Sequence, residues 1–498
     1  MTGPLPFPSE FGPPGPPAAG LSDQSPRTGH VPSSPDLVAD AVISPPLRER
    51  MAATDRPIGV VIELRLRFPG GVPAAAARVV ALLRDRRSVV NGSYVTTALT
   101  PGEIRDLARA DREEAPAGGV APTEPVRADR GAIYRMWPNF GITALITKSI
   151  ITTKCQAVHR SFNATGRGIV WAVVDSGIQG DHPHFANNLE GLPHKSFVDG
   201  DPLRDPAGHG THVAGILAGQ QIPENGKPLT GAVWYQDDNG TVQPRVTTFP
   251  SVSGMAPECQ LLSCQVLRPD ESGDITALLA ALQYIADLNR GGRDLVVHGV
   301  NISVGHPFDP SWFATGLTPV CREVDNLVRS GVVVVVAAGN TGYGYAGDRE
   351  NQLMRVGFEM TINDPGNAAL AITVGSTSSS PHSTGVSYFS SKGPTGDGRM
   401  KPDIVAPGER VISAAAGALA VKAKSVSPDA TYIENSGTSM AAPHVSGAAA
   451  AFLSVHREFI GQPDAVAKAL VSTATDLGRA RTFQGAGLVD AMRAIQSV

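Results

Sequence analysis

The 498-residue chain has few charged residues, few cysteines and no long apolar run, and each shortage excludes a class of protein. Charged residues make up 18% and the net charge is -4, so no excess of basic charge favours nucleic acid or an acidic membrane surface. No apolar run reaches the roughly 18 residues that a membrane-spanning helix needs. The sequence therefore predicts neither a nucleic-acid partner nor a membrane partner.

The four cysteines are too few for a fold held together by disulfide bonds in a chain of this length, and no CxxC pair indicates zinc. Cys259 and Cys264 cannot form a disulfide if they share a strand, because five extended residues span about 16 Å and bridged Cα atoms lie within about 7 Å. With Cys155 and Cys321 they are interpreted as buried thiols. No signal peptide is visible from Met1 or Met51. We expect a cytoplasmic location, with export by an unrecognised route as the alternative.

Proline and glycine dominate the first 56 residues, which hold 12 of the 41 prolines. This segment has few aromatic residues and no hydrophobic periodicity. Such a composition buries too little apolar surface to offset the entropy of ordering the chain. We therefore predict that residues 1–56 are disordered.

A small α+β domain is predicted over residues 57–140. Alternation of apolar and charged residues over 62–68 is typical of a half-buried strand, and an alanine-rich helix is expected over 73–87. Thr100 and Glu103 have the spacing of a capping box, which predicts a short helix. We expect this helix to end at Ala108. Further strands are expected over 94–99 and 133–137.

Near-continuous apolar runs alternate with helical segments in residues 141–498. The runs cover residues 169–174, 261–267, 295–302, 332–338 and 370–374. Runs without polar alternation indicate strands covered on both faces, and intervening helices indicate parallel βαβ units. The sequence predicts an α/β domain with a doubly wound, mostly parallel sheet. In such folds, functional groups lie just beyond the carboxyl ends of the strands.

Three polar residues in glycine-flanked turns are candidates for chemistry. Asp175 ends the first apolar run, His209 follows Gly208, and Ser439 precedes an alanine-rich stretch. Taken singly, a turn-forming aspartate or a helix-capping serine is the ordinary interpretation, and His212 is interpreted as a packed core histidine. Taken together, an acid, a base and a hydroxyl at one edge of a sheet are the groups that nucleophilic catalysis needs.

Asn340 is a fourth candidate, because it follows the apolar run 332–338 directly after Gly339. An asparagine after a glycine is usually a turn former. Acyl transfer, however, requires a hydrogen-bond donor for the developing oxyanion, and a side-chain amide supplies one. Asn340 is therefore a candidate oxyanion donor.

From about Gly168 to the C-terminus, the chain resembles the catalytic domain of the subtilisin-like serine proteases, the subtilases. The segments that carry the resemblance are 175–178, 208–215, 301–305, 337–340, 389–393, 401–408 and 437–444. The resemblance implies that Ser439 attacks the scissile carbonyl and that His209 transfers its proton. It also implies that Asp175 orients the imidazole, and that Asn340 and the Ser439 N–H receive the oxyanion.

Substrate binding is also implied by the resemblance. The substrate backbone would pair, as an added strand, with Ser303, Val304 and Gly305. No carboxylate is certain at the base of the pocket for the residue before the cut, and acidic residues after Asn340, such as Asp364, are interpreted as exposed loop charges. We expect a broad or hydrophobic preference at that residue.

Many subtilases bind calcium through an acidic residue shortly after the catalytic aspartate, and this chain departs from that pattern. The corresponding stretch is His182-Pro183-His184, and a neutral imidazole is a poor ligand for a hard cation. The acidic cluster 237–240, inside a polar insertion over 219–254, is interpreted as a solvated turn rather than a calcium site. We expect no cofactor and no calcium at the usual strong site.

The predicted small domain stands where subtilases carry an inhibitory, chaperone-like prodomain. Its predicted pattern is one strand short of the ferredoxin-like pattern of such prodomains, and a partner-binding module is the alternative. For the whole chain, the resemblance implies a serine endopeptidase that acts on polypeptides through an acyl-enzyme. A non-catalytic scaffold protein on the same fold, or a transpeptidase with the same triad, is the alternative. The sequence does not indicate an oligomeric state.

Overall fold

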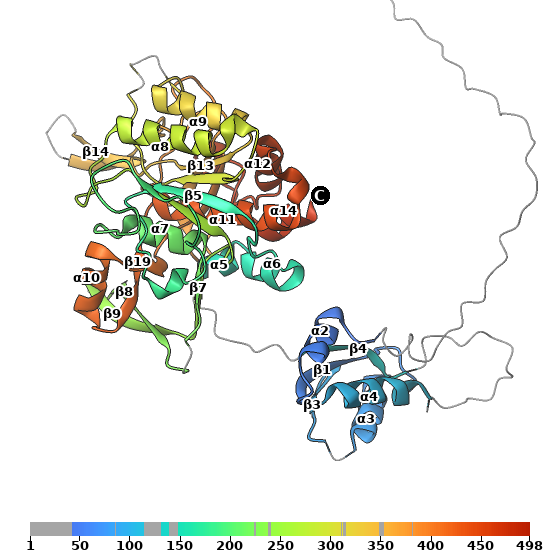
Figure 1. Cartoon of the computed structure of the whole chain (residues 1–498). Helices are drawn as coiled ribbons and strands as arrows, with labels where there is room; N and C mark the ends of the chain where they lie inside the picture. The colour runs from blue at the N-terminus through green and yellow to red at the C-terminus, as the bar shows by residue number, and fades with distance from the viewer. Residues whose placement is uncertain are drawn as a thin grey trace, which may run out of the picture. The chain divides into compact units, whose positions relative to one another are not determined.

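The computed structural model describes residues 42–84, 86–113, 131–138, 148–223, 226–237, 241–309, 311, 315–347, 353–380 and 382–498. The chain divides into two compact units, residues 1–142 and 143–498, and each is described by itself (Figure 1). Within the described ranges, every helix is too short or too polar to cross a membrane.

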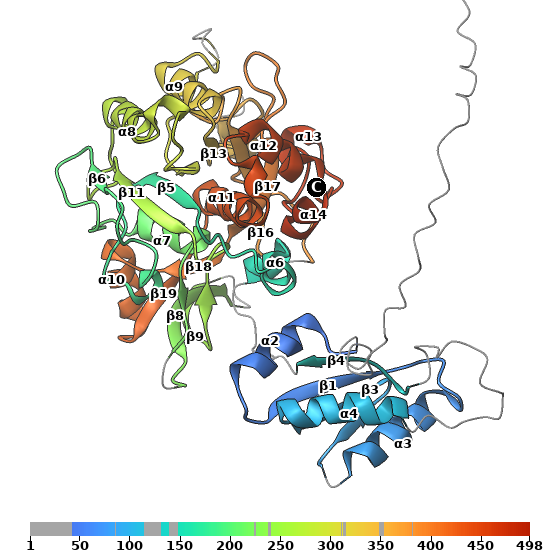
Figure 2. The same cartoon turned by 45° about the vertical axis from the view of Figure 1, so that its right-hand side comes forward.

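The N-terminal unit is a four-stranded antiparallel sheet with the strand order β2-β3-β1-β4. Figure 2 shows α3 and α4 side by side on one face of this sheet. The order of elements along the chain is βαββαβ, which is the ferredoxin-like arrangement. The elements are β1 (Ile58–Leu64), α3 (Gly71–Leu83), β2 (Val89–Asn91), β3 (Tyr94–Leu99), α4 (Pro101–Glu113) and β4 (Ile133–Pro138).

Two sequence-based expectations for this sheet need correction. The first strand lies four residues earlier than expected: β1 begins at Ile58, and Leu66 is 68% exposed beyond its end. The chain leaves the sheet there because Gly70 and Gly71, both with positive φ, turn it into α3. The strand missing from the predicted pattern is β2, whose three residues are all exposed. An exposed strand shows no alternation of apolar and polar residues, so the residues of β2 did not indicate a strand.

The predicted capping box at the start of α4 is confirmed. The backbone N–H and the hydroxyl of Thr100 both donate to the Glu103 carboxylate, at 2.8 and 3.0 Å. The Glu103 N–H donates in return to the Thr100 hydroxyl at 3.4 Å. This reciprocal pair fixes where the helix begins, although the helix runs to Glu113, beyond the expected end at Ala108.

The end of the segment expected to be disordered is ordered. Helix α2 (Pro45–Ala53) follows a short bridge between Ile43 and Met136 of β4. Its prolines stand in the first turn, where their missing N–H groups are tolerated. The prediction failed because the helix has only one short apolar stripe, whose residues Leu47 and Met51 join the core of the unit together with Ile43, which precedes the helix. Residues 1–41 of that prediction lie outside the described residues.

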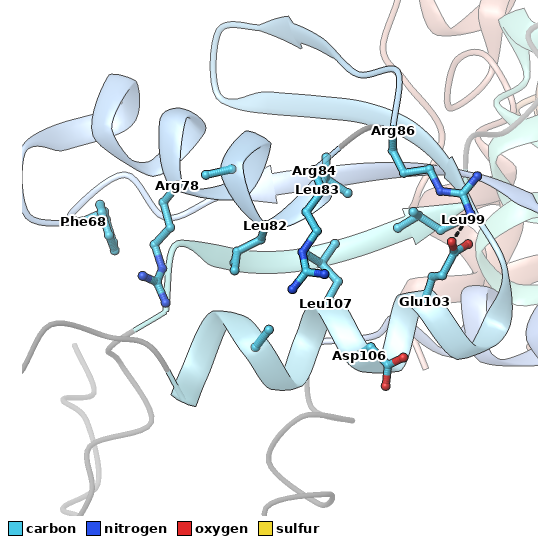
Figure 3. Close-up of a pocket in the computed structure, with 12 residues that line it drawn as sticks. Phe68, Arg78, Leu82, Leu83, Arg84, Arg86, Leu99, Glu103, Asp106 and Leu107 are labelled. Atoms are coloured by element: carbon cyan, nitrogen blue, oxygen red, sulfur yellow. Dashed lines mark hydrogen bonds and ion pairs between the residues drawn. The ribbon is translucent and has the colours of Figure 1, made fainter.

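A cavity of about 970 Å³ lies between α3 and α4 (Figure 3). Its lining combines apolar side chains, among them Leu82, Leu83 and Leu107, with charged ones. At one end of the cavity, Arg86 forms an ion pair with Glu103. This ion pair links the segment after α3 to the first turn of α4.

The second unit contains a seven-stranded sheet with the order β17-β16-β13-β12-β5-β11-β6, in which all neighbours pair in parallel. This confirms the predicted doubly wound, parallel α/β fold, and each predicted apolar run contains one strand. The strands are β5 (Val170–Asp175), β6 (Lys195–Ser196), β11 (Gln260–Gln265), β12 (Gly299–Ile302), β13 (Val333–Ala337), β16 (Ile372–Ser378) and β17 (Ile404–Glu409).

Helices cover both faces of this sheet (Figures 1 and 2). Trp171 and Val173 of β5 join one core with α7 and α11, whereas Ala172 and Val174 join the other core with α8 and α9. This double coverage explains why the strands read as continuous apolar runs. The covering helices are α7 (His209–Leu217), α8 (Ile275–Leu288), α9 (Pro319–Arg329) and α11 (Thr438–Val455).

The insertion over 219–254 adds strands to a second sheet, with the order β18-β19-β8-β9. Of its acidic cluster, residues 238–240 lie outside the described residues. The remaining elements are α5 (Lys148–Thr152), α6 (Cys155–Phe162), β7 (Gln220–Gln221), β8 (Leu229–Gln236), β9 (Val242–Phe249), β10 (Val252–Ser253), β14 (Tyr343–Gly347), β15 (Leu353–Gly357), β18 (Val411–Ala414), α10 (Gly417–Val426), β19 (Ala430–Asn435), α12 (Pro463–Ser472), α13 (Arg481–Gln484) and α14 (Ala491–Gln496). All four cysteines are free and buried, as predicted.

Candidate active site

Asp175 is the last residue of β5 and is completely buried. Its Oδ1 accepts hydrogen bonds from the Ser176 N–H at 2.8 Å and from His209 Nδ1 at 2.7 Å. Its Oδ2 is buried without a hydrogen-bond partner in the described part of the chain. A positive charge on the neighbouring imidazole strongly stabilises the ionised form of such a buried carboxylate.

His209 is the first residue of α7, next to Gly208, whose φ of 90° lies in the left-handed region. A side chain at Gly208 would collide with the carbonyl oxygen of Ala416, so this turn requires glycine. Because Asp175 accepts at Nδ1, this nitrogen carries the proton, and Nε2 is left as the basic nitrogen. Burial lowers the pKa of His209, but the charge of Asp175 and its hydrogen bond together outweigh burial and raise this pKa to about 9.

The turn before His209 is held by Asp205, which is 1% exposed and which the sequence analysis did not single out. Its carboxylate accepts from the Ser176 hydroxyl and the Gly208 N–H, both at 2.8 Å. It also accepts from the N–H and the hydroxyl of Thr211. Burial raises the pKa of Asp205, and these four donors oppose that effect. Asp205 therefore ties the end of β5 to the start of α7.

Ser439 is the second residue of α11 and is half-buried. Its hydroxyl donates to the carbonyl oxygen of Ser303 at 3.0 Å, and the Ser303 hydroxyl donates to the Ser439 carbonyl at the same distance. Among the described residues, the Ser439 hydroxyl therefore bonds to Ser303 and not to His209. The predicted contact between hydroxyl and imidazole is not made in this conformation.

The sheet register brings Ser439 and His209 to neighbouring strand ends. Ile302 of β12 pairs with Val174 of β5, so Ser303 and Asp175 follow side by side on adjacent strands, about 4.8 Å apart. Ser439 is bonded to the first of these residues and His209 to the second. The three candidate residues thus meet at one edge of the sheet.

Asn340 lies just beyond β13, and Thr438 fixes the orientation of its side chain. The N–H and the hydroxyl of Thr438 donate to Asn340 Oδ1 at 2.9 and 3.0 Å. Because a backbone N–H can only donate, the oxygen of the amide faces Thr438 and Nδ2 faces away. Thr438 lies within the segment 437–444, whose sequence alone did not indicate this role. Its role depends on a contact between residues 98 positions apart.

The segment Ser303, Val304 and Gly305 follows β12 and becomes steadily more exposed along the chain. A side chain at Gly305 would collide with the carbonyl oxygen of Asp364, which explains the glycine. Asp364 itself was expected to be an exposed loop charge, and this is wrong: it is completely buried. Its carboxylate accepts from the Thr318 hydroxyl at 2.6 Å and from Asn367 at 2.8 Å.

His184 lies where many subtilases have a calcium ligand, and it is completely buried. Its Nδ1 contacts the Tyr432 hydroxyl at 3.1 Å, and its Nε2 lies 3.2 and 3.1 Å from the carbonyl oxygens of Gly215 and Ala218. Burial, together with the neighbouring His182, lowers the pKa of His184 to about 3. In the described part of the chain, no group of three acidic, histidine or cysteine side chains could hold a metal ion. A neutral ring bonded in this way does not fit a hard cation.

His212 is a packed core histidine, as predicted. It is completely buried on α7, and its Nε2 lies 3.1 Å from the carbonyl oxygen of Ile433. Burial lowers the pKa of His212 to about 3, so the ring is neutral near pH 7. Of the two histidines in this motif, only His209 contacts a carboxylate.

Comparison with known proteins agrees with this geometry. Residues 166–488 match the model of the subtilase family. The chain is 30% identical over 376 residues to the serine protease AprX of Bacillus subtilis, which covers 73% of this chain and 74% of that protein. It is 31% identical over 345 residues to subtilisin E of Bacillus subtilis, covering 69% of each. It is also 31% identical over 343 residues to subtilisin Savinase of Lederbergia lenta, covering 69% of this chain and 96% of the relative.

The family match spans the strands, turns and helix that carry the candidate residues, from β5 to the segment after α11. Members of this family are serine peptidases, so polypeptides are the substrates that the family implies. The chain belongs to the subtilase family of serine proteases.

Proposed function

We propose that this protein is a serine endopeptidase whose catalytic residues are Asp175, His209 and Ser439. The observation that carries the proposal is the 2.7 Å hydrogen bond between His209 Nδ1 and Asp175 Oδ1, one strand away from the residue that holds Ser439. The bond orients the imidazole so that Nε2 is the nitrogen available to take a proton.

Catalysis requires the Ser439 hydroxyl to leave the Ser303 carbonyl and turn toward His209 Nε2. Rotation about one side-chain bond moves the oxygen in this way, and such catalytic hydrogen bonds are often formed only once substrate is bound. Nε2 then takes the hydroxyl proton as the oxygen attacks the scissile carbonyl. The same nitrogen returns the proton to the departing amine, which leaves an acyl-enzyme that water hydrolyses.

Asn340 and the backbone N–H of Ser439 are proposed to receive the oxyanion. Thr438 holds the amide oxygen of Asn340, so Nδ2 is free of that contact and faces away from Thr438. The Ser439 N–H lies at the first turn of α11, where the helix dipole also favours negative charge. Both donors are held before substrate arrives, which is what makes such a site effective.

Ser303, Val304 and Gly305 are proposed to bind substrate backbone as an added strand. The segment follows directly on β12, and Gly305, which has no side chain, is exposed. The buried carboxylate of Asp364 is occupied by Thr318 and Asn367. This supports a broad or hydrophobic preference at the residue before the cut.

The proposal is tested by incubating the full chain and its Ser439→Ala variant with an unstructured protein and identifying the products by mass spectrometry. We expect internal cleavage by the native chain, and a loss of at least about four powers of ten in rate for the variant. No cleavage by the native chain would favour a scaffold protein on this fold. New peptide bonds instead of free carboxyl ends would favour a transpeptidase.

We also propose that the position of His184 holds no calcium and that the enzyme needs no cofactor. The imidazole lies against carbonyl oxygens that would otherwise be available to a cation, and its neutral form contributes no negative charge. We expect a chelator such as EDTA to leave the melting temperature of the full chain within about 1 °C. A fall of several degrees that calcium reverses would overturn this part of the proposal.

The N-terminal unit is proposed to act as a prodomain. Its βαββαβ order supplies the strand that the sequence pattern lacked, which supports this interpretation over an unrelated partner-binding module. The mass of the native protein tests it, because removal of the unit would leave a chain that begins near the boundary at residue 142. We propose a cytoplasmic location because all four thiols are unpaired, which cell fractionation would test.

A further inference from the structure

We propose that a pocket beside Asn340 binds a large apolar side chain, above all an aromatic one, of the first substrate residue after the cut. The inference rests on the proposed function and adds a preference on the leaving-group side of the same site. The pocket has a volume of about 470 Å³. Its lining includes Asn340, Tyr343, Tyr388, Phe389, Glu409 and Gly437.

The order of the strands shows on which side of the cut this pocket lies. The segment proposed to hold the acyl part of the substrate follows β12, Asn340 follows β13, and Glu409 ends β17. In the sheet, β12 and β17 lie on opposite sides of β13. With the scissile carbonyl at Asn340, the acyl part extends toward β12, and the leaving amine therefore extends toward the pocket.

Aromatic rings form the wall of the pocket and already pack edge to face. The ring centroids of Tyr343 and Tyr388 are 4.8 Å apart, and those of Tyr388 and Phe389 are 5.4 Å apart. Tyr388 nevertheless remains 65% exposed, so much of its ring is uncovered. An aromatic side chain from the substrate would extend this packing and remove apolar surface from water.

The charged residues of the pocket do not favour an acidic side chain. The Arg410 guanidinium is turned to the Glu434 carboxylate, at 3.1 Å, and to the carbonyl oxygen of Trp234. The Glu409 carboxylate forms no ion pair with a cation among the described residues. An incoming carboxylate would therefore meet an uncompensated negative charge.

The aromatic wall is tied firmly to the segment that carries Asn340. Lys392 is 5% exposed, and its Nζ donates to the carbonyl oxygens of Gly342 at 2.7 Å and Tyr388 at 3.2 Å. The Gly342 N–H donates in turn to the Phe389 carbonyl at 3.0 Å. These bonds link the segment after Asn340 to the segment of Tyr388, so the wall keeps its position relative to the oxyanion donor.

The leaving-group side can be probed separately by acyl transfer. A peptide ester acylates Ser439 without placing any amino acid in the pocket, and an amino-acid amide then competes with water for the acyl-enzyme. The amine nitrogen attacks the acyl carbonyl, a C–N bond forms as the C–O bond to Ser439 breaks, and His209 passes the amine proton to the serine oxygen. The ratio of peptide to acid products measures how well each amide occupies the pocket.

The experiment compares phenylalanine amide, glycine amide and aspartate amide on the full chain and on Tyr388→Ala. We expect phenylalanine amide to react at least about tenfold better than the other two, and Tyr388→Ala to reduce that advantage to less than about threefold. Ester hydrolysis without added amide should stay within about twofold. Tyr345→Ala is the matched control, because Tyr345 is an exposed tyrosine of the hairpin that carries Tyr343 but does not line the pocket.

Equal reaction of the three amides, with normal ester hydrolysis, would overturn this inference and leave the proposed function intact. A phenylalanine advantage that persists in Tyr388→Ala, or that is lost equally in Tyr345→Ala, would also overturn it. Absence of ester hydrolysis would overturn the proposed function, and this inference with it.

Discussion

Both units of the chain bury a carboxylate near the end of an element, Asp111 in α4 and Asp175 in β5, and these two carboxylates have different partners. In the N-terminal unit, Asp111 accepts from the Arg78 guanidinium at 3.1 Å and from the N–H groups of Ala132 and Ile133 at 2.9 Å. In the catalytic unit, Asp175 accepts from His209, and one of its oxygens has no partner among the described residues.

The partner decides what each carboxylate can do. An arginine keeps its proton throughout the physiological range, so the bonds at Asp111 only join α4 to α3 and to the start of β4. A histidine gains and loses a proton in that range, so the pair at Asp175 controls a proton that can move. The comparison teaches that burial alone does not indicate a catalytic carboxylate. A titratable partner at a strand end does indicate one.

The largest effect should come from replacing each carboxylate by an amide. We expect Asp175→Asn to lower kcat/KM by about three to four powers of ten, because the imidazole loses both its orientation and its stabilising charge. Asp111→Asn should instead leave kcat/KM per titrated active site unchanged and lower the stability of its unit by about 3 kcal/mol. Active-site titration, steady-state kinetics and denaturant unfolding measure the two outcomes. Equal losses of activity in both variants would remove the distinction.

A second substitution examines the oxyanion donor without changing the shape of the site. Asn340→Asp keeps an oxygen that accepts from Thr438 but removes the N–H group. We expect kcat to fall by about two to three powers of ten with little change in KM, the range known for such donors rather than one obtained from this geometry. Steady-state kinetics on a peptide substrate measure the split. A change confined to KM would assign Asn340 to substrate binding.

The pH profile of kcat/KM sharpens the contrast between the two partners. The pKa of His209 is raised to about 9, so near pH 7 most of the imidazole is protonated and cannot act as a base. We expect kcat/KM to rise about fiftyfold from pH 7 to pH 9 and to level off above about pH 10. In Asp175→Asn the inflection should move to lower pH, because the charge that raises this pKa is gone. A flat profile would argue against His209 as the base.

Acid should unfold the catalytic unit before the N-terminal unit, because residues 42–138 contain no histidine. Burial lowers the pKa values of His184 and His212 to about 3 and that of His444 to about 4, below the unfolded value of about 6.5. The unfolded chain therefore binds more protons as pH falls below 6.5, and stability is lost. At pH 5 each histidine should remove about 2 kcal/mol, and the raised pKa of His209 acts oppositely by about 1 kcal/mol.

Denaturant unfolding at pH 7.5 and pH 5, followed separately for the two units by hydrogen exchange, measures this difference. His212→Asn is the control, because an uncharged residue at that position removes one of the three contributions. Equal loss of stability in both units at pH 5 would contradict the account.

The smallest expected effect concerns the capping box of the N-terminal unit. Thr100→Ala removes the hydroxyl of the reciprocal pair with Glu103 and should destabilise this unit by about 1 kcal/mol. Thr96→Ala is the matched control, because it removes a hydroxyl held by one long contact of 3.4 Å, to the Val89 carbonyl of the exposed strand β2. Denaturant unfolding measures both. A similar loss in the two variants would show that the box adds nothing particular.

The sequence predicted the catalytic sheet more accurately than the N-terminal sheet, for a physical reason. A strand such as β13 is covered on both faces, so every residue is apolar and the run is easy to recognise. In β1, buried residues alternate with half-buried ones, and the exposed β2 is defined only by its pairing with β3. A strand like β2 is recognised from its pairing with a neighbouring strand and not from the pattern of its own residues.

The site shows the same limit. Asp175, His209, Ser439 and Asn340 could be proposed as site residues from the sequence because each stands in a motif that continues along the chain. The residues that position them could not be predicted as readily. The roles of Asp205, Thr438 and Lys392 arise from contacts with segments elsewhere in the sequence, and a single chain without its fold does not reveal such contacts.

The central claim, that His209 activates Ser439 as a nucleophile, is tested most directly by a fluorophosphonate probe that reacts with activated serines. Mass spectrometry of the full chain locates the adduct. The account predicts one adduct, on Ser439, that is absent from both Ser439→Ala and His209→Ala while circular dichroism shows these variants folded. No adduct on the folded native chain, an adduct on a different serine, or undiminished labelling in His209→Ala would contradict it.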